Sequence, residues 1–156
     1  MTGLNAEDAS GVGMAVPRTT LRSILLFLAL FAATAEAFAA DAQVSVELNK
    51  LEPSGDACRA YLVLENGTDR AFETLKLDLV MFDMDGIDAK RLAVETAPLP
   101  AGKTSLKVFD IEGLACERLG RLLLNDVLAC ADASGVQEGC QALVSPSARG
   151  ATEFIK

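Results

Sequence analysis

Four cysteines are the residues of this chain best suited to covalent chemistry. Cys58, Cys116, Cys130 and Cys140 form an even set, and no two of them have Cys-x-x-Cys spacing. The sequence has no histidine, so a thiolate would have no imidazole beside it as a base or as a second metal ligand. In an exported chain this pattern favours two structural disulfides over a metal site or a redox pair.

The expected strands suggest which cysteines meet. Four cysteines allow three pairings, and Cys58 opens one expected strand while Cys116 lies just beyond the end of another, Thr104–Ile111. If those two strands run antiparallel, these cysteines meet at one end of the sheet. Cys130 and Cys140 then close a short loop. The sequence therefore predicts the pairs Cys58–Cys116 and Cys130–Cys140, each stabilising by about 2–4 kcal/mol.

The acidic segment Asp83–Asp88 resembles the front of a calcium loop. A complete loop needs a third acidic or amide residue before its glycine and a glutamate six residues after it. Here Gly86 directly follows the second aspartate, and the sixth residue beyond it is Leu92. We interpret the segment as a hairpin turn with solvated carboxylates, and keep a weak surface calcium site as the alternative.

Other catalytic and metal chemistry finds little support in the sequence. Met81 and Met84 are three residues apart on an expected strand, so they point to opposite faces and, without a bulge, cannot share a copper ion. The serines and threonines have no histidine partner. The chain has no tryptophan and one tyrosine, which argues against a sugar platform for glycosidase carboxylates. We predict no catalytic residue, no cofactor and no metal.

Charge narrows the choice of partner. The chain has 156 residues, which is enough for one domain. Its formal charge is −8. An acidic surface is repelled by nucleic acid and by anionic lipid headgroups, so neither is expected as a partner.

The N-terminal region has the proportions of a secretory signal. Arg18 and Arg22 precede the apolar run Ser23–Ala33, and small residues follow at the positions a signal peptidase reads. We predict a signal peptide over 1–39 with cleavage after Ala39, a cut after Ala42 being the second choice and an uncleaved anchor the alternative. Residues 1–13 are unusual before a signal, so we expect the true start at Met14. The mature protein is then expected to be periplasmic or secreted, without a stable membrane anchor.

Period-two alternation and turn residues organise the remainder. Thr74–Gly86 is the central stretch, since one face of its expected strand is wholly apolar and Asp85-Gly86 supplies a turn. The pattern predicts an all-β, antiparallel sandwich of 6–7 strands over 40–144, with a flexible tail over 145–156. The six clearest strands are Gln43–Leu51, Cys58–Asn66, Thr74–Met84, Ile87–Thr96, Thr104–Ile111 and Gly120–Ala131, the last bent near Asn125-Asp126; Gln141–Val144 is the candidate seventh.

Three segments resemble the FxLYD-type immunoglobulin-like domains of bacterial extracytoplasmic proteins. Leu62–Thr68 is similar to that family's strand ending in Asn-x-Ser/Thr, and Leu75–Gly86 to its long alternating strand. Leu99–Lys103 is similar to its Leu-x-Pro-Gly turn, with one residue inserted. The resemblance covers about Arg59–Ile111. It implies an immunoglobulin-like fold and an extracytoplasmic address, and it brings no catalytic residues.

These observations favour a non-enzymatic binding or accessory role on another envelope protein. Val63, Val80 and Phe82 alternate with the inward residues of their strands, so they are expected either in the core or in an exposed apolar patch. Two alternatives remain open: an enzyme or calcium-binding domain that uses carboxylates alone, and a structural envelope component.

Overall fold

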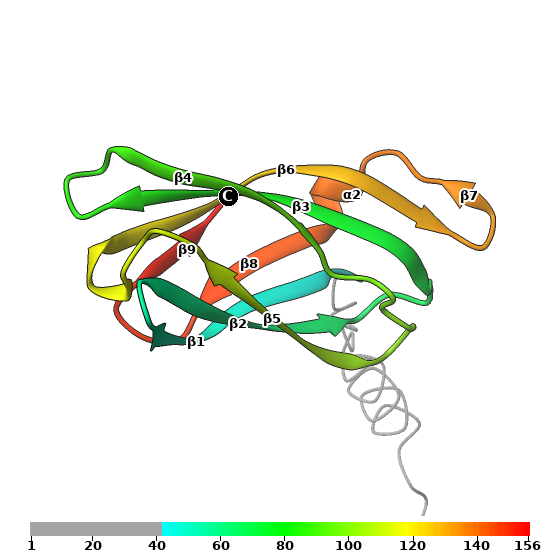
Figure 1. The fold of residues 1–156 in the computed structure, drawn as a ribbon. Helices are drawn as coiled ribbons and strands as arrows, with labels where there is room; N and C mark the ends of the chain where they lie inside the picture. The colour runs from blue at the N-terminus through cyan, green and yellow to red at the C-terminus, as the bar shows by residue number, and fades with distance from the viewer. Residues whose placement is uncertain (1–41) are drawn as a thin grey trace, which may run out of the picture. The chain divides into compact units, whose positions relative to one another are not determined.

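The computed structural model of the chain describes residues 42–156 (Figure 1). The predicted signal peptide, 1–39, and the expected start at Met14 lie outside the described residues. Within the described part, no helix is both long and apolar enough to cross a membrane. Residues 42–156 form nine strands and two short helical segments, so the prediction of an all-β domain is confirmed.

Sheet A contains four strands in the order β5-β2-β1-β8. These strands are β1 (Val44–Ser54), β2 (Ala57–Asn66), β5 (Thr104–Ile111) and β8 (Val144–Ala148). The β1–β2 and β2–β5 pairs are antiparallel, whereas β8 runs parallel to β1. As the alternation predicts, Val44, Val46 and Leu48 share one buried face.

Sheet B contains five strands, in the order β4-β3-β6-β7 with β9 also paired to β6. These strands are β3 (Phe72–Asp83), β4 (Asp88–Glu95), β6 (Leu119–Asp132), β7 (Gly135–Val136) and β9 (Glu153–Ile155). A 3₁₀ turn, η2 (Cys116–Arg118), precedes β6, and a one-turn helix, α2 (Cys140–Leu143), precedes β8. The inner faces of both sheets contribute to one hydrophobic core.

The strand predicted to be central, β3, lies between β4 and β6. Leu75, Leu77, Leu79 and Met81 are buried on its inner face, each at 1% exposure or less. The β3–β4 turn places Gly86 at φ +79°, a conformation that glycine adopts without a Cβ penalty. This turn and the alternation before it account for the hairpin.

The sheets are mixed, which corrects the prediction of a purely antiparallel sandwich. The parallel pairs are β1–β8 and β6–β9, and both arise from the C-terminal part of the chain. That part was expected to fray over 145–156, but it contributes most of β8 and all of β9, and Phe154 is buried. The candidate seventh strand, Gln141–Val144, is mostly the helix α2, with β8 beginning at Val144.

The ambiguous segment Gly120–Ala131 is a strand, as predicted, and it is bent. Its pairing with β3 shifts register between Asp126 and Leu124, so Asn125 is the extra residue of a bulge. At its start, a Cβ on Gly120 would lie 2.4 Å from the Asp83 carbonyl oxygen, so glycine allows β6 to approach the end of β3.

Candidate functional site

The outer face of sheet A carries an apolar strip at its β5 end. Leu106 and Val108 are 61% and 40% exposed, and they lie opposite Val63 and Tyr61 of β2. Directly opposed residues of neighbouring strands share one face of a sheet, so the four side chains form a continuous surface. We call this surface, made of Tyr61, Val63, Leu106 and Val108, the outer strip.

The sequence predicted the β5 strand, but not which of its faces points outward. Phe109 and Ile111 take the inner positions, because they pair with Ala60 and Cys58, which are fully buried in β2. The outer strip therefore receives the other apolar pair of β5. The larger apolar residues at 109 and 111 were the available signal, but alternation by itself does not choose between the faces.

The charges at the Tyr61–Val108 end of the outer strip are paired within the domain. Arg59 Nε donates to Asp110 Oδ1 at 2.8 Å, and Arg59 Nη2 donates to Asp110 Oδ2 at 3.0 Å. This two-point contact lowers the pKa of the Asp110 carboxyl and raises that of the Arg59 guanidinium. Asp110 thus presents a carboxylate whose charge is already neutralised at the edge of the strip.

The far side of the same face is similarly self-paired. Glu47 accepts hydrogen bonds from Asn49 Nδ2 at 2.7 Å and from Arg149 Nε at 3.2 Å, which lower the pKa of its carboxyl. Lys50 pairs with Glu52, and its ammonium lies 5.0 Å from the Tyr61 ring centroid. The outer strip is consequently the apolar end of this face. At the other end, the charged side chains are paired with one another.

A groove of about 290 Å³ lies between the edges of β4 and β5. Both strands end their sheets in the described part of the chain, so neither has a second neighbour. We call this the open side of the domain. Its lining comes from both strands: Leu92, Ala93, Val94, Glu95, Lys107, Phe109 and Asp110.

The opposite side is filled by the C-terminal part of the chain, from Cys130 onward. There β8 borders β1, β7 and β9 border β6, and the side chain of Phe154 is only 5% exposed. Lys156 Nζ also donates to the Val144 carbonyl at 2.7 Å, which ties the end of the chain to the start of β8. We call this the closed side.

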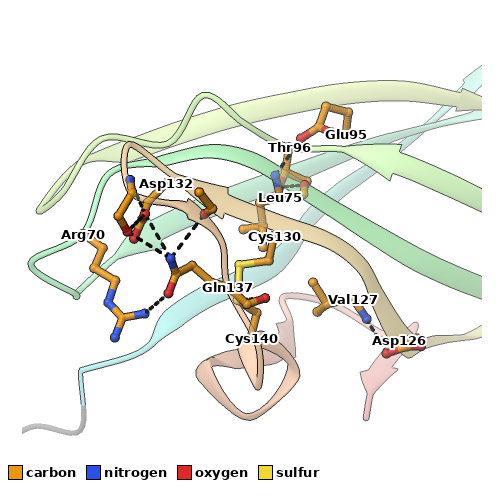
Figure 2. Close-up of a disulfide and its surroundings, with 12 residues drawn as sticks. Arg70, Leu75, Glu95, Thr96, Asp126, Val127, Cys130, Asp132, Gln137 and Cys140 are labelled. Carbon is orange, nitrogen blue, oxygen red and sulfur yellow. Dashed lines mark hydrogen bonds between the residues drawn. A yellow bond between two sulfur atoms is a disulfide. The ribbon is translucent and has the colours of Figure 1, made fainter.

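The predicted Cys130–Cys140 disulfide fastens the closed side. It joins β6 to α2 with a Cα–Cα distance of 6.4 Å, and Figure 2 shows it beside a small hydrogen-bond network. In that network Gln137 Nε2 donates to Asp132 Oδ1 at 3.1 Å, and Arg70 Nη1 donates to Gln137 Oε1 at 3.4 Å. Bonds from the Ser134 hydroxyl and N–H lower the pKa of Asp132.

The other predicted disulfide, Cys58–Cys116, is also present. Its cysteines lie 4.7 Å apart at Cα, where the start of β2 meets the turn η2 that follows β5. This is the end-of-sheet meeting predicted from two antiparallel strands. No free cysteine occurs among residues 42–156, and each disulfide joins two elements of the fold.

The three residues predicted as a possible patch do not lie together. Val63 is half-buried in the outer strip, whereas Val80 and Phe82 belong to sheet B. Val80 is 8% exposed, and the Arg121 guanidinium covers the Phe82 ring at 5.2 Å. Val63 and Phe82 are both half-buried, but they lie on different sheets, so the three residues form no single exposed patch.

Asp78 is a buried carboxylate on the outer face of sheet B. Its side chain accepts from Arg91 Nε at 2.8 Å, from Arg91 Nη2 at 2.5 Å and from Asn125 Nδ2 at 2.7 Å. The Arg91 contact is the main cause of the lowered pKa of Asp78. Through these three hydrogen bonds, the Asp78 carboxylate links β4 to β6 across β3.

In the acidic β3–β4 turn, backbone N–H groups of the turn bind the Asp83 carboxylate. Asp83 Oδ1 accepts the N–H groups of Asp85 at 3.0 Å and Ile87 at 2.9 Å, which is turn chemistry. Residues 42–156 contain no group of three carboxylate, thiol or imidazole side chains placed to hold a metal. Met81 is fully buried whereas Met84 is 71% exposed, so the two thioethers do not face one site.

The Asn66-Gly67-Thr68 motif has a structural role that the sequence did not reveal. Asn66 is fully buried, and its Nδ2 donates to the carbonyls of Arg70, Leu99 and Pro100 at 2.7, 3.1 and 3.2 Å. Its Oδ1 accepts from the Thr68 hydroxyl at 2.7 Å. Asn66 therefore fastens the β2–β3 and β4–β5 connections together.

Comparison with known proteins leaves the family open. No family model matches the chain, and no curated protein matches it. One solved structure, described as the structural characterization of IrmA from Escherichia coli, is similar with a TM-score of 0.48 and 16% sequence identity. The similarity covers 67% of this chain and 90% of that one.

Proposed function

We propose that the mature chain is an exported, disulfide-stabilised binding domain that acts on another envelope protein and has no enzymatic activity of its own. The observation that carries the proposal is the outer strip. It exposes Leu106 and Val108 beside a sheet edge, and large apolar side chains gathered on one surface are typical of protein contacts.

The N-terminal sequence and the two disulfides support the proposed cellular location of the protein. The segment Arg18–Ala39 has the features of a secretory signal. Two disulfides are compatible with an oxidising compartment, where such bonds persist. We place the mature protein in the periplasm or outside a bacterial cell, with an immunoglobulin-like sandwich of the FxLYD type as the proposed fold family.

The rival functions receive less support. A calcium site would need the Asp83 carboxylate, yet Asp83 Oδ1 already accepts two backbone N–H groups in the turn. A purely structural component would need no exposed apolar surface, and the outer strip is such a surface. A binding role accounts for the exposed outer strip.

Site-specific photo-crosslinking in intact cells of the native host tests the proposal. A photoreactive residue at position 106 is expected to give a discrete covalent adduct with another protein. The same residue at position 136, an equally apolar and 85% exposed site on β7, serves as the matched control. Absence of an adduct at 106, or the same adducts at both positions, would contradict a binding role for the outer strip.

A further inference from the structure

Both strands of the open side carry a lysine on their core-facing side. Lys107 of β5 lies opposite Leu62, and Lys90 of β4 lies opposite Met81. Both opposed residues are fully buried, and opposed residues share a face, so the two lysines project from the inner rather than the outer faces of their sheets. Each is half-buried.

An inward lysine on an edge strand restricts which strands can pair there. Any added strand covers the ammonium, and covering a charge without a counter-charge is unfavourable. The inner-facing residues of β5 are Ser105, Lys107, Phe109 and Ile111, none of which is acidic. Two β5 strands of two copies would therefore bring two ammonium groups to one face, and self-pairing is disfavoured.

The carboxylates nearest to the groove are already engaged. Asp110 is held by Arg59 through two hydrogen bonds. Glu95 Oε1 accepts the N–H groups of Leu75 at 2.9 Å and Ala97 at 3.0 Å. Among residues 42–156, no carboxylate forms an ion pair with Lys107. The groove thus presents a cation without a partner, together with the apolar side chains of Leu92 and Phe109.

We propose that the open side accepts an extended segment of a partner protein as an additional strand on β5. The apolar side chains of this segment cover Leu92 and Phe109. A carboxylate that lies between those apolar side chains in the segment pairs with Lys107. Backbone hydrogen bonds supply affinity in this mode, and the side chains at alternate positions supply specificity. This inference rests on the proposed binding function and names the chemistry of the partner: an extended, apolar segment with an acidic residue at one inward position.

An NMR titration of the isotope-labelled mature protein tests strand addition directly. The probe is the capped peptide Thr-Val-Thr-Glu-Thr-Val-Thr, whose alternate positions present valine, glutamate and valine to one face. At millimolar peptide we expect amide shifts in Thr104–Ile111 and Leu92–Glu95. The matched peptide with glutamine in place of glutamate is expected to bind about threefold to fivefold more weakly, which is the upper part of the range for an exposed ion pair.

Charge reversal makes the test specific. Lys107→Glu is expected to reverse the preference, so that a peptide with a central lysine binds better than the glutamate peptide. Lys103→Glu makes the same change of charge at an exposed position just before β5 and is expected to keep the wild-type preference. Amide spectra of both variants establish that they are folded.

The possible outcomes separate the two proposals. No shifts in β5, shifts elsewhere only, or equal binding of the glutamate and glutamine peptides would overturn strand addition. If crosslinks at position 106 persist in that case, the binding function stands and the partner docks on the outer strip by another mode. If those crosslinks are absent too, both proposals fail.

Discussion

The two sides of this domain are completed in different ways. On the closed side the chain supplies its own covering strands, β8 and β9, a disulfide and the buried ring of Phe154. On the open side β4 and β5 have no further neighbour in the described residues, and a groove separates them. Both sides are built from strands with alternating apolar residues. They differ because the C-terminal segment of the chain covers the closed side and does not cover the open side.

The contrast indicates where stability and binding are expected to reside. Burial of large apolar side chains dominates folding free energy, and it is concentrated where the core is covered. A surface that must accept a partner has to leave part of its apolar area and its backbone edge exposed. We therefore expect substitutions on the closed side to act mainly on stability, and substitutions on the open side mainly on binding.

The largest difference should come from two phenylalanines, one on each side. Phe154→Ala removes a buried ring from the closed side and is expected to lower the free energy of unfolding by about 4 kcal/mol. Phe109→Ala removes a half-buried ring from the open side, with an expected loss of about 2 kcal/mol. Urea unfolding of the oxidised mature protein measures both, and equal losses would contradict the contrast.

The Cys130–Cys140 disulfide is expected to stabilise the closed side in particular. Replacing both cysteines by alanine is expected to lower the free energy of unfolding by about 3 kcal/mol, mainly by releasing a constraint on the unfolded chain. Because the bridge joins β6 to the helix before β8, the variant should lose amide protection first in β8 and β9. Protection lost first in β4 and β5 would show that the bridge does not serve this side.

Asp78 links the two sides, since it binds Arg91 of β4 and Asn125 of β6. Its folded pKa is lowered, so its contribution is present above the unfolded value near 4 and is lost as the pH falls through the folded value. Asp78→Asn is expected to cost about 2 kcal/mol at pH 7 and to flatten the acid limb of a stability–pH profile. Asp110→Asn, at a half-buried pair nearer the surface, should change stability less. An unchanged acid limb in Asp78→Asn would contradict this assignment.

The smallest effect on stability should occur in the outer strip. Leu106→Thr keeps a strand-forming residue at an exposed position, so we expect a change within about 0.5 kcal/mol in the free energy of unfolding. The same substitution should reduce crosslinking from a photoreactive residue at the neighbouring position 108. A large loss of stability with undiminished crosslinking would contradict the binding role assigned to the outer strip.

The sequence was a good guide wherever pairing is local or the alternation is strong. It predicted β3 as the central strand, β5 with its observed ends, the bulge at Asn125 and both disulfides. These features depend on period-two patterns, turn residues and the direction of neighbouring strands, all of which are readable along the chain.

The sequence was a poor guide to the closed side and to the direction of β5. Small polar residues over 145–156 predict fraying, but β8 and β9 form because distant strands offer them edges. Leu106 and Val108 point outward because a second apolar pair on β5 competes for the inner face. Both outcomes are decided by tertiary pairing, which local patterns do not encode.

Residue-resolved amide hydrogen exchange of the free, oxidised mature protein is the decisive measurement for the contrast between β1, which β8 covers, and β5, which ends sheet A. We expect the amides of Val44–Leu48, which border β8, to be protected like the core. We also expect the alternate amides of Thr104–Ile111 that face away from β2 to exchange much faster than the others. Equal and strong protection of every β5 amide in dilute solution would show that this edge is already covered, and would contradict the assignment of an open side.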